Sequence, residues 1–397
     1  MKRGLYLALV AAALAIAAEP VHVIPISVRD GNIFISTRLA DSGPWQFEFD
    51  SAAAGHVVNR RIADDLKLKI HSIVTAQGAG DGSTQAAFLA DTALSLEGLE
   101  LPPSSLAAID LDPVSDRKAY RLDGLIGTDL MRHWVVECDY AASLMRLYDP
   151  ATWRYRGLGE SLPLRTDSMG KAYVTTDVHI PGREPVKADF LIDSAAGPGT
   201  AVFTSPFALK HDMVAAVRRA GLPVLTDEIM GVGGTSASWI TRVDAIRIGR
   251  TTLRRPVVTI TGAKGGTLAR SDIAGLIGGA LLSRFRVIYD LPHARLYLEP
   301  GNRIEAPFED DMAGIRWVAY TPDRTRFRVR DLIPGSPAAQ AGVAVGDILL
   351  AVDDRTAGTF DRQWLREALR VEGRHVHLIF DRQGTKREVT MVLRRLV

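Results

Sequence analysis

Apolar and polar residues alternate along most of this chain, in short runs separated by Gly, Asp or Asn. The clearest alternating runs are residues 21–40, 173–180 and 285–290. A period of two indicates β-strands with one buried face. Helical spacing, with apolar residues three or four apart, is confined to a few segments: 60–68, part of 203–220, and 360–369. The pattern therefore predicts a mainly β protein with few helices.

One sequence of features occurs twice in the first three quarters of the chain. A strand runs into Asp-Ser-Ala-Ala at Asp50 and again at Asp193, which is 193 − 50 = 143 residues later. Each copy continues with a glycine-rich tip, a Gly-Leu-Ile-Gly motif (124–127 and 275–278) and two strands ending in Arg-Leu-Tyr. Agreement at five points in the same order indicates a duplicated β unit.

The two repeated aspartates are candidates for paired acid–base chemistry. An Asp-Ser at the end of one strand is usually a simple turn, because Asp can accept hydrogen bonds from its own backbone. Duplicated halves, however, can bring two such turns together. Two carboxylates held close cannot both ionise, so they share a proton, and one then acts as base while the other acts as acid. We therefore expect Asp50 and Asp193 to face each other.

The last segment, residues 307–397, has no counterpart in the repeat. It contains a Pro-Gly-Ser-Pro-Ala turn at 334–338 and Gly-Asp-Ile-Leu at 346–349, each leading into an apolar element. These motifs resemble a PDZ domain of the bacterial protease type. The resemblance implies a small α+β fold that binds an extended peptide, often by its free C-terminus, as a strand added to a sheet edge. It places the carboxylate-binding loop near Gly314 and Ile315.

The duplicated region resembles the retropepsin-like aspartic proteases, with two copies fused in one chain. The Asp-Ser turns, the glycine-rich tips and the Gly-Leu-Ile-Gly motifs carry this resemblance. It implies a bilobal protein with acid-protease β-barrel lobes at 21–157 and 160–303. It also implies that Asp50 and Asp193 form a catalytic dyad that activates water for the hydrolysis of a polypeptide, without a cofactor. Because one chain supplies both lobes, a monomer is sufficient.

The same resemblance assigns roles to residues around the dyad. Ser51 and Ser194 would hydrogen-bond across the two turns. Mobile flaps would close over the substrate, with these residues at their tips: Gly78, Ala79, Gly80, Gly231, Val232 and Gly233. Neither a Cys cluster nor a His-Glu-x-x-His motif occurs, so we expect no metal site.

Both copies depart from the family pattern at one position. The family has Gly after Asp-Thr or Asp-Ser, whereas this chain has Ala52 and Ala195. Where the backbone needs a positive φ, Ala in place of Gly costs about 1 kcal/mol. The alternative hypothesis is thus a catalytically inactive protease fold that binds peptides at the cell envelope. A third hypothesis is a structural adaptor that acts through the PDZ domain alone.

Composition and the N-terminus bear on location and partners. The 397-residue chain has a formal net charge of +2 and no basic cluster, which gives no electrostatic basis for nucleic-acid binding. Residues 1–18 have a positive start, an apolar run and an Ala-x-Ala site, typical of a signal peptide cleaved near Ala17 or Ala18. We expect a secreted or periplasmic protein without a membrane span after cleavage. Cys138 is the only cysteine, so no internal disulfide can form.

Overall fold

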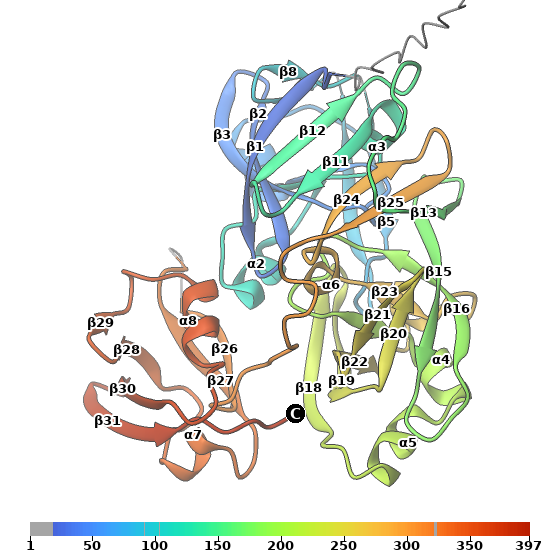
Figure 1. Ribbon diagram of the computed structural model, residues 1–397. Helices are drawn as coiled ribbons and strands as arrows, with labels where there is room; N and C mark the ends of the chain where they lie inside the picture. The colour runs from blue at the N-terminus through green and yellow to red at the C-terminus, as the bar shows by residue number, and fades with distance from the viewer. Residues whose placement is uncertain (1–18, 91, 103, 321–323) are drawn as a thin grey trace, which may run out of the picture.

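The chain folds into two β lobes with a smaller domain beside them. The structure is a computed structural model that describes residues 19–397 except 91, 103 and 321–323. In Figure 1 the first lobe lies at the top, the second at the lower right, and the C-terminal domain at the lower left. The proposed signal peptide, residues 1–18, lies outside the described residues.

The first lobe is built almost entirely of short strands. Its elements are β1 (His22–Arg29), β2 (Asn32–Leu39), β3 (Ser42–Phe49), β4 (His56–Asn59), α1 (Arg60–Asp65), β5 (Ile70–Ala76), β6 (Thr84–Leu89), β7 (Leu94–Leu96), β8 (Leu99–Glu100), β9 (Leu106–Ile109), α2 (Asp112–Lys118), β10 (Gly124–Ile126), α3 (Asp129–His133), β11 (Val135–Asp139) and β12 (Leu144–Tyr148). Helix α2 was not predicted from the sequence.

The second lobe follows a similar order, with three α-helices and one 3-10 helix where the described part of the first lobe has three α-helices. Its elements are β13 (Glu160–Pro163), β14 (Arg165–Thr166), β15 (Ala172–His179), β16 (Val186–Ile192), β17 (Ala201–Phe203), α4 (Ser205–Lys210), α5 (Met213–Arg219), β18 (Leu225–Gly231), β19 (Gly234–Arg242), β20 (Ala245–Ile248), β21 (Thr251–Arg254), β22 (Val257–Thr261), the 3-10 helix η1 (Thr267–Ala269), β23 (Gly275–Ile277), α6 (Gly279–Leu282), β24 (Phe285–Asp290) and β25 (Arg295–Pro300). The helical stretch expected within 203–220 is divided at Asp212, which has a φ of 45°.

The sheet topology of the two lobes is matched. In the first lobe β10 lies between β3, to which it is parallel, and β4, to which it is antiparallel. In the second lobe β23 lies in the same way between β16 and β17. The closing strands β11 and β24 pair antiparallel across the lobes, so that the two halves share one sheet. The duplicated, mainly β architecture predicted from the sequence is confirmed.

The C-terminal domain is a small sheet with one main helix. Its elements are β26 (Ile315–Ala319), β27 (Phe327–Leu332), α7 (Pro337–Gln340), β28 (Ile348–Val352), β29 (Arg355–Thr356), α8 (Arg362–Ala368), β30 (His375–Arg382) and β31 (Thr385–Val392). The strand order is β26-β27-β28-β30-β31, so β26 is an edge strand. This domain has its own apolar core, which includes Trp317, Phe327 and Phe380.

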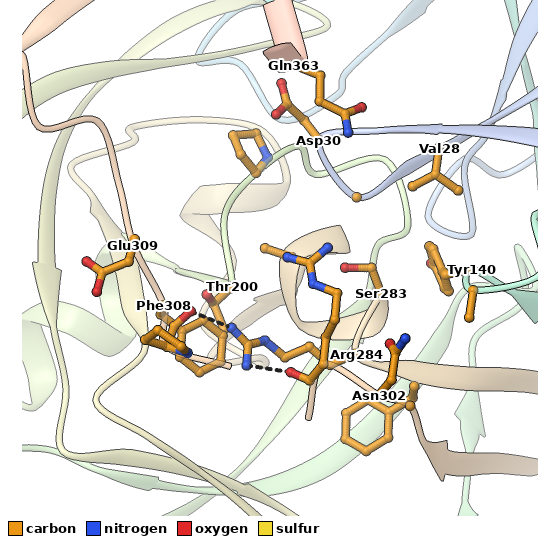
Figure 2. A pocket seen from close by; sticks show the side chains of 18 of the residues that line it. Val28, Asp30, Tyr140, Thr200, Ser283, Arg284, Asn302, Phe308, Glu309 and Gln363 are labelled. Carbon is orange, nitrogen blue, oxygen red and sulfur yellow. Dashed lines mark hydrogen bonds between the residues drawn. The ribbon is translucent and has the colours of Figure 1, made fainter. Parts of the chain in front are cut away.

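The linker to this domain is fixed against the second lobe. The buried Arg284 donates hydrogen bonds to the carbonyls of Arg303, Ile304 and Pro307, at 3.1, 3.2 and 3.1 Å. Its guanidinium also lies 3.5 Å from the centroid of the Phe308 ring, a cation–π contact. Figure 2 shows Arg284 and Phe308 in a pocket of about 320 Å³ where both lobes and the C-terminal domain meet. The linker is therefore an ordered part of the fold.

Candidate active site

The two Asp-Ser turns have the same local geometry. Asp50 follows β3, and its backbone N–H donates to the carbonyl of Ile126 in β10, at 2.9 Å. Asp193 follows β16, and its N–H donates to the carbonyl of Ile277 in β23, also at 2.9 Å. In each lobe the Gly-Leu-Ile-Gly strand thus holds the start of the aspartate turn. Leu and Ile of both motifs are buried, which explains why this short strand is apolar.

Two serines connect the turns through reciprocal hydrogen bonds. The Ser51 N–H donates to Oγ of Ser194 and the Ser194 N–H donates to Oγ of Ser51, both at 3.0 Å. Each hydroxyl then donates to a carbonyl of the opposite lobe, Ser51 to Ile192 at 2.9 Å and Ser194 to Phe49 at 2.6 Å. Both serines are fully buried. This network brings the predicted residues Asp50 and Asp193 together at the interface of the lobes.

The backbone at Ala52 and Ala195 accommodates alanine. Neither residue is among those with a positive φ, so the penalty considered from the sequence does not arise at either position. Both alanine N–H groups instead support the preceding aspartate: Ala52 donates to Oδ1 of Asp50 at 2.8 Å, and Ala195 donates to Oδ1 of Asp193 at 3.0 Å. The Ala for Gly replacement is therefore compatible with the geometry of an aspartate turn.

The two carboxyl groups differ in their surroundings. Burial, followed by the charge of Asp50, raises the pKa of Asp193 to about 8, and the Ala195 amide and Lys118 only partly oppose this. Burial also raises the pKa of Asp50, but the Ala52 amide, Lys118, Lys171 and the Ala53 amide all act to lower it. Asp50 accepts two amide hydrogen bonds whereas Asp193 accepts one. The geometry thus favours a proton on Asp193 and a negative charge on Asp50.

A buried ion pair beside the dyad was missed by the sequence analysis. Lys118, at the end of α2, places Nζ 2.8 Å from both carboxylate oxygens of Glu48 and 3.1 Å from the carbonyl of Ala195. Glu48 lies two residues before Asp50, and its side chain is 1% exposed. Burial raises the pKa of Glu48 to about 7, although Lys118 opposes the shift. Burial lowers the pKa of Lys118, but Glu48 and Tyr120 outweigh it, so the net shift is upward.

Sequence signals for this pair existed, but they were weak. Glu48 is an acid within an otherwise apolar strand end, Phe47 to Phe49. Helix α2 begins with Asp112 and Pro113 and ends with two basic residues, a charge order that favours helix formation. Nothing in either segment indicates that they meet, because they lie 70 residues apart.

The predicted flap tips lie at the ends of two hairpins. Gly78, Ala79 and Gly80 follow β5, whereas Gly231, Val232 and Gly233 connect β18 with β19. The hairpins touch: the Gly80 N–H donates to the carbonyl of Val232 at 3.0 Å, and the Gly82 N–H donates to that of Gly233 at 2.9 Å. A side chain at Gly80 would collide with Gly233 and Gly234, so this close approach requires glycine.

The hairpins cover a cleft of about 550 Å³ that has the dyad on its floor. The walls are mostly apolar and come from both lobes: Val57, Val74, Phe88, Leu122, Leu191, Ile229 and Leu268. His56 also lines the cleft, where burial lowers its pKa to about 4. Its Nδ1 accepts a hydrogen bond from the Gly127 N–H at 3.1 Å, which fits a neutral ring. The cleft suits an extended chain with apolar side chains.

The predicted carboxylate-binding loop of the C-terminal domain is already occupied. The N–H groups of Gly314 and Ile315 donate to Oδ1 of Asp311, at 2.5 and 3.2 Å. Asp311 is buried, with 8% of its surface exposed. The two amides expected to bind a peptide therefore face a carboxylate of the same chain.

Other classes of site are not evident in the part of the chain that the structure describes. Among residues 19–397, with the gaps given above, no three His, Cys, Asp or Glu side chains are grouped so as to hold a metal ion. In the same residues, no helix combines the length and apolar character that crossing a membrane requires.

Comparisons with known proteins identify the C-terminal domain and find solved structures that are similar to the chain. Residues 328–382 match the family model of the PDZ domain, so the predicted PDZ domain is confirmed. No curated protein matches the chain. The chain is similar to the aspartic proteinase of Irpex lacteus (14% identity, TM-score 0.46, covering 72% of this chain and 98% of that one). It is also similar to Basic 7S globulin from soybean (12% identity, TM-score 0.41, covering 72% of this chain and 96% of that one).

Proposed function

We propose that this chain is an exported aspartic endopeptidase that hydrolyses extended polypeptides with Asp50 and Asp193. The observation that carries the proposal is the reciprocal Ser51–Ser194 hydrogen bonding, which joins two equivalent aspartate turns at the floor of one cleft. Such an arrangement favours a shared proton, which is the requirement for acid–base activation of water.

The electrostatic difference between the carboxyl groups suggests which of them acts as the base and which as the acid. Asp50, which has more stabilising donors around it, would be the base that takes a proton from water. Asp193, which retains its proton to about pH 8, would donate that proton to the carbonyl oxygen of the scissile peptide. The hydroxide adds to the carbonyl carbon and gives a tetrahedral diol. The C–N bond then breaks as the leaving nitrogen takes up the proton from Asp50, and one hydroxyl of the diol returns its proton to Asp193 as the new carboxyl group forms. No covalent enzyme intermediate is required.

The walls and roof of the cleft support a polypeptide as substrate. The apolar lining contributed by both lobes would bury alternating side chains of an extended peptide. The backbone groups of the two hairpins lie above it, where they would pair with the peptide main chain. The PDZ domain would bind a peptide C-terminus, and export is proposed from residues 1–18.

The decisive experiment is cleavage of an unfolded protein, such as denatured casein, by purified residues 19–397 between pH 3 and pH 9. We expect Asp50→Asn and Asp193→Asn each to lower kcat/KM by about 10²–10⁴-fold. Wild-type activity should decline above about pH 8, as Asp193 loses its proton. The matched control is Asp189→Asn. Asp189 lies in β16, the strand that leads to Asp193, and its side chain accepts a hydrogen bond from Thr175 at 2.7 Å.

Each outcome has a defined meaning. Loss of cleavage in both dyad variants, with Asp189→Asn active, supports the dyad. A folded wild-type protein that binds peptides without cleaving them would favour the inactive peptide-binding alternative. Cleavage that survives both dyad substitutions would reject the assignment of Asp50 and Asp193.

A further inference from the structure

The PDZ groove of this protein is covered by its own first lobe. Helix α2 lies against the edge strand β26, and Ala119, which follows α2, packs into the PDZ core with Ile315, Trp317 and Leu365. Beyond β26, Arg324 forms ion pairs with two acids of α2, Asp112 at 3.2 Å and Asp116 at 2.9 Å. Helix α2 thus lies where an added peptide strand would pair.

The carboxylate position of the groove is also filled. As described above, Oδ1 of Asp311 accepts hydrogen bonds from the N–H groups of Gly314 and Ile315. These two amides would otherwise receive the terminal carboxylate of a peptide. The chain therefore supplies both parts of an internal ligand: Asp311 for the carboxylate, and Ala119 for a small terminal side chain.

The same face of the PDZ domain holds the stem of the second flap. Arg316 of β26 lies 3.1 Å from Asp227 of β18, and Arg330 of β27 lies 2.6 Å from Asp227 and 3.2 Å from Glu228. Arg117 of α2 lies 3.4 Å from the same Asp227. The flap tip begins at the end of β18, a few residues from these contacts.

Helix α2 also reaches the dyad. Arg117 contacts the flap stem, and the next residue, Lys118, binds Glu48 and the carbonyl of Ala195 in the second aspartate turn. One seven-residue helix therefore contacts the PDZ groove, a flap and the catalytic floor. In Figure 1 this helix lies on the side of the first lobe that faces the PDZ domain.

We propose that α2 and Asp311 form an internal ligand of the PDZ groove, and that a polypeptide with a free C-terminal carboxylate and a small terminal side chain displaces them. Displacement frees the β18 stem and moves Lys118, so that groove occupancy controls the flap and the dyad. This proposal rests on the proposed function for its effect on catalysis, but not for the binding event.

The residues between the domains can receive an incoming carboxylate. A cavity of about 210 Å³ lies there, lined by residues of both lobes and of the PDZ domain. Two guanidinium nitrogens that border it, Nη2 of Arg316 and Nη1 of Arg362, are buried and have no hydrogen-bond partner among the described residues. Buried donors of this kind gain most from an anionic partner.

The test uses a fluorescein-labelled ten-residue Gly/Ser peptide ending in Val-Ala with a free carboxylate, and the same peptide amidated. Binding is measured by anisotropy on residues 19–397 carrying Asp50→Asn, so that the probe is not cleaved. In this background we compare Asp116→Lys, which reverses a partly exposed charge facing Arg324, with Asp311→Ala, which empties the loop. The matched control is Asp354→Asn, an exposed aspartate elsewhere in the PDZ domain.

We expect Asp116→Lys and Asp311→Ala to bind the free-acid peptide more tightly than the Asp50→Asn parent, by about 5- to 150-fold. The control should match the parent, and the amidated peptide should bind much more weakly. Saturating peptide should also increase hydrogen exchange of residues 225–242, the second flap hairpin. Equal affinity of the parent and both variants, or unchanged exchange in this hairpin at saturation, overturns the proposal.

The outcome can be separated from that of the proposed function. Binding and hydrogen exchange need no catalysis, so their increase supports the internal ligand even if wild-type protein cleaves nothing. Conversely, a protein that cleaves casein but fails both readouts retains its protease function and loses this mechanism of control.

Discussion

The two lobes are nearly equivalent around the aspartates and differ just behind them. In the first lobe the position two residues before the aspartate is Glu48, whereas in the second lobe it is Leu191, which is also 143 residues further on. The helix between the flap hairpin and the Gly-Leu-Ile-Gly strand also differs: in the first lobe it is α2, which carries Lys118, and in the second lobe it is the short 3-10 helix η1. The common parts hold the dyad, and the differing parts give its two members unequal electrostatic surroundings.

This comparison indicates what duplication permits. The hydrogen bonds that join the turns are symmetric, because each lobe provides a serine at the equivalent position. The buried ion pair of Glu48 and Lys118 lies on one side alone. Lys118 acts on both aspartates, but Asp50 is also affected by Lys171 and accepts two amide hydrogen bonds, whereas Asp193 accepts one. A dimer of identical subunits carries any such pair on both sides. A fused chain can place it once, and so give the two aspartates different surroundings.

The largest expected effect comes from breaking the first-lobe pair. Lys118→Met leaves the buried Glu48 carboxylate without its partner, which should lower the unfolding free energy by about 3–5 kcal/mol. Adding Glu48→Leu makes this position like Leu191 and should recover most of that loss. Urea unfolding of the lobes measures both variants. The control is Lys171→Met, a cleft lysine that is partly exposed. A cost no larger for Lys118→Met than for this control would contradict the importance of the pair.

A smaller effect concerns pH. Folded Asp193 keeps its proton to about pH 8, whereas an unfolded aspartate loses it near pH 4. Between these values the folded state binds the additional proton, so the contribution to stability is complete below about pH 4 and is lost as the pH rises through about 8. We expect urea-unfolding free energies to decline less steeply between pH 5 and pH 8 in Asp193→Asn than in wild type. Parallel pH profiles of the two proteins would show that Asp193 does not hold the proton.

The smallest effect tests whether alanine weakens the turns. Because neither Ala52 nor Ala195 has a positive φ, glycine should relieve no strain at either position. Ala52→Gly and Ala195→Gly should each lower the unfolding free energy by about 0.5–1 kcal/mol, through the greater freedom of the unfolded chain. The two losses should be similar, since the turns are equivalent. A gain in stability or in cleavage rate from either change would show that alanine distorts its turn.

The sequence predicted those features whose signals are local and repeated. Asp50 and Asp193 each follow a strand with an alternating apolar pattern, and each is followed by Ser-Ala-Ala. The duplication could therefore be predicted without knowing any contact between residues. The PDZ domain was predicted for a similar reason, because its turns and glycines have fixed spacing. The hydrogen bonds of Ser51 and Ser194 across the two turns were predicted from the family resemblance.

The features that were missed depend on contacts between distant residues. Helix α2 has only seven residues and lacks a clear apolar stripe, so periodicity could not reveal it. The Glu48–Lys118 pair joins two distant segments of the first lobe, and the Asp227 contacts with Arg316 and Arg330 form only when the second lobe packs against the PDZ domain. Charge along the sequence does not determine which of many acids and bases will meet. The self-occupied PDZ loop was also not predicted, although Asp311 lies only three residues before Gly314.

The contact between the hairpin tips sets the route by which a chain can reach the floor. The N–H groups of Gly80 and Gly82 donate to the carbonyls of Val232 and Gly233, and the Thr267 N–H donates to the carbonyl of Gly78 at 2.9 Å. These backbone bonds join the two lobes across the roof of the cleft. A free chain end can thread through it lengthwise, whereas an internal loop enters only after these backbone bonds separate. The topology of the substrate, as well as its sequence, would therefore decide how quickly it is engaged.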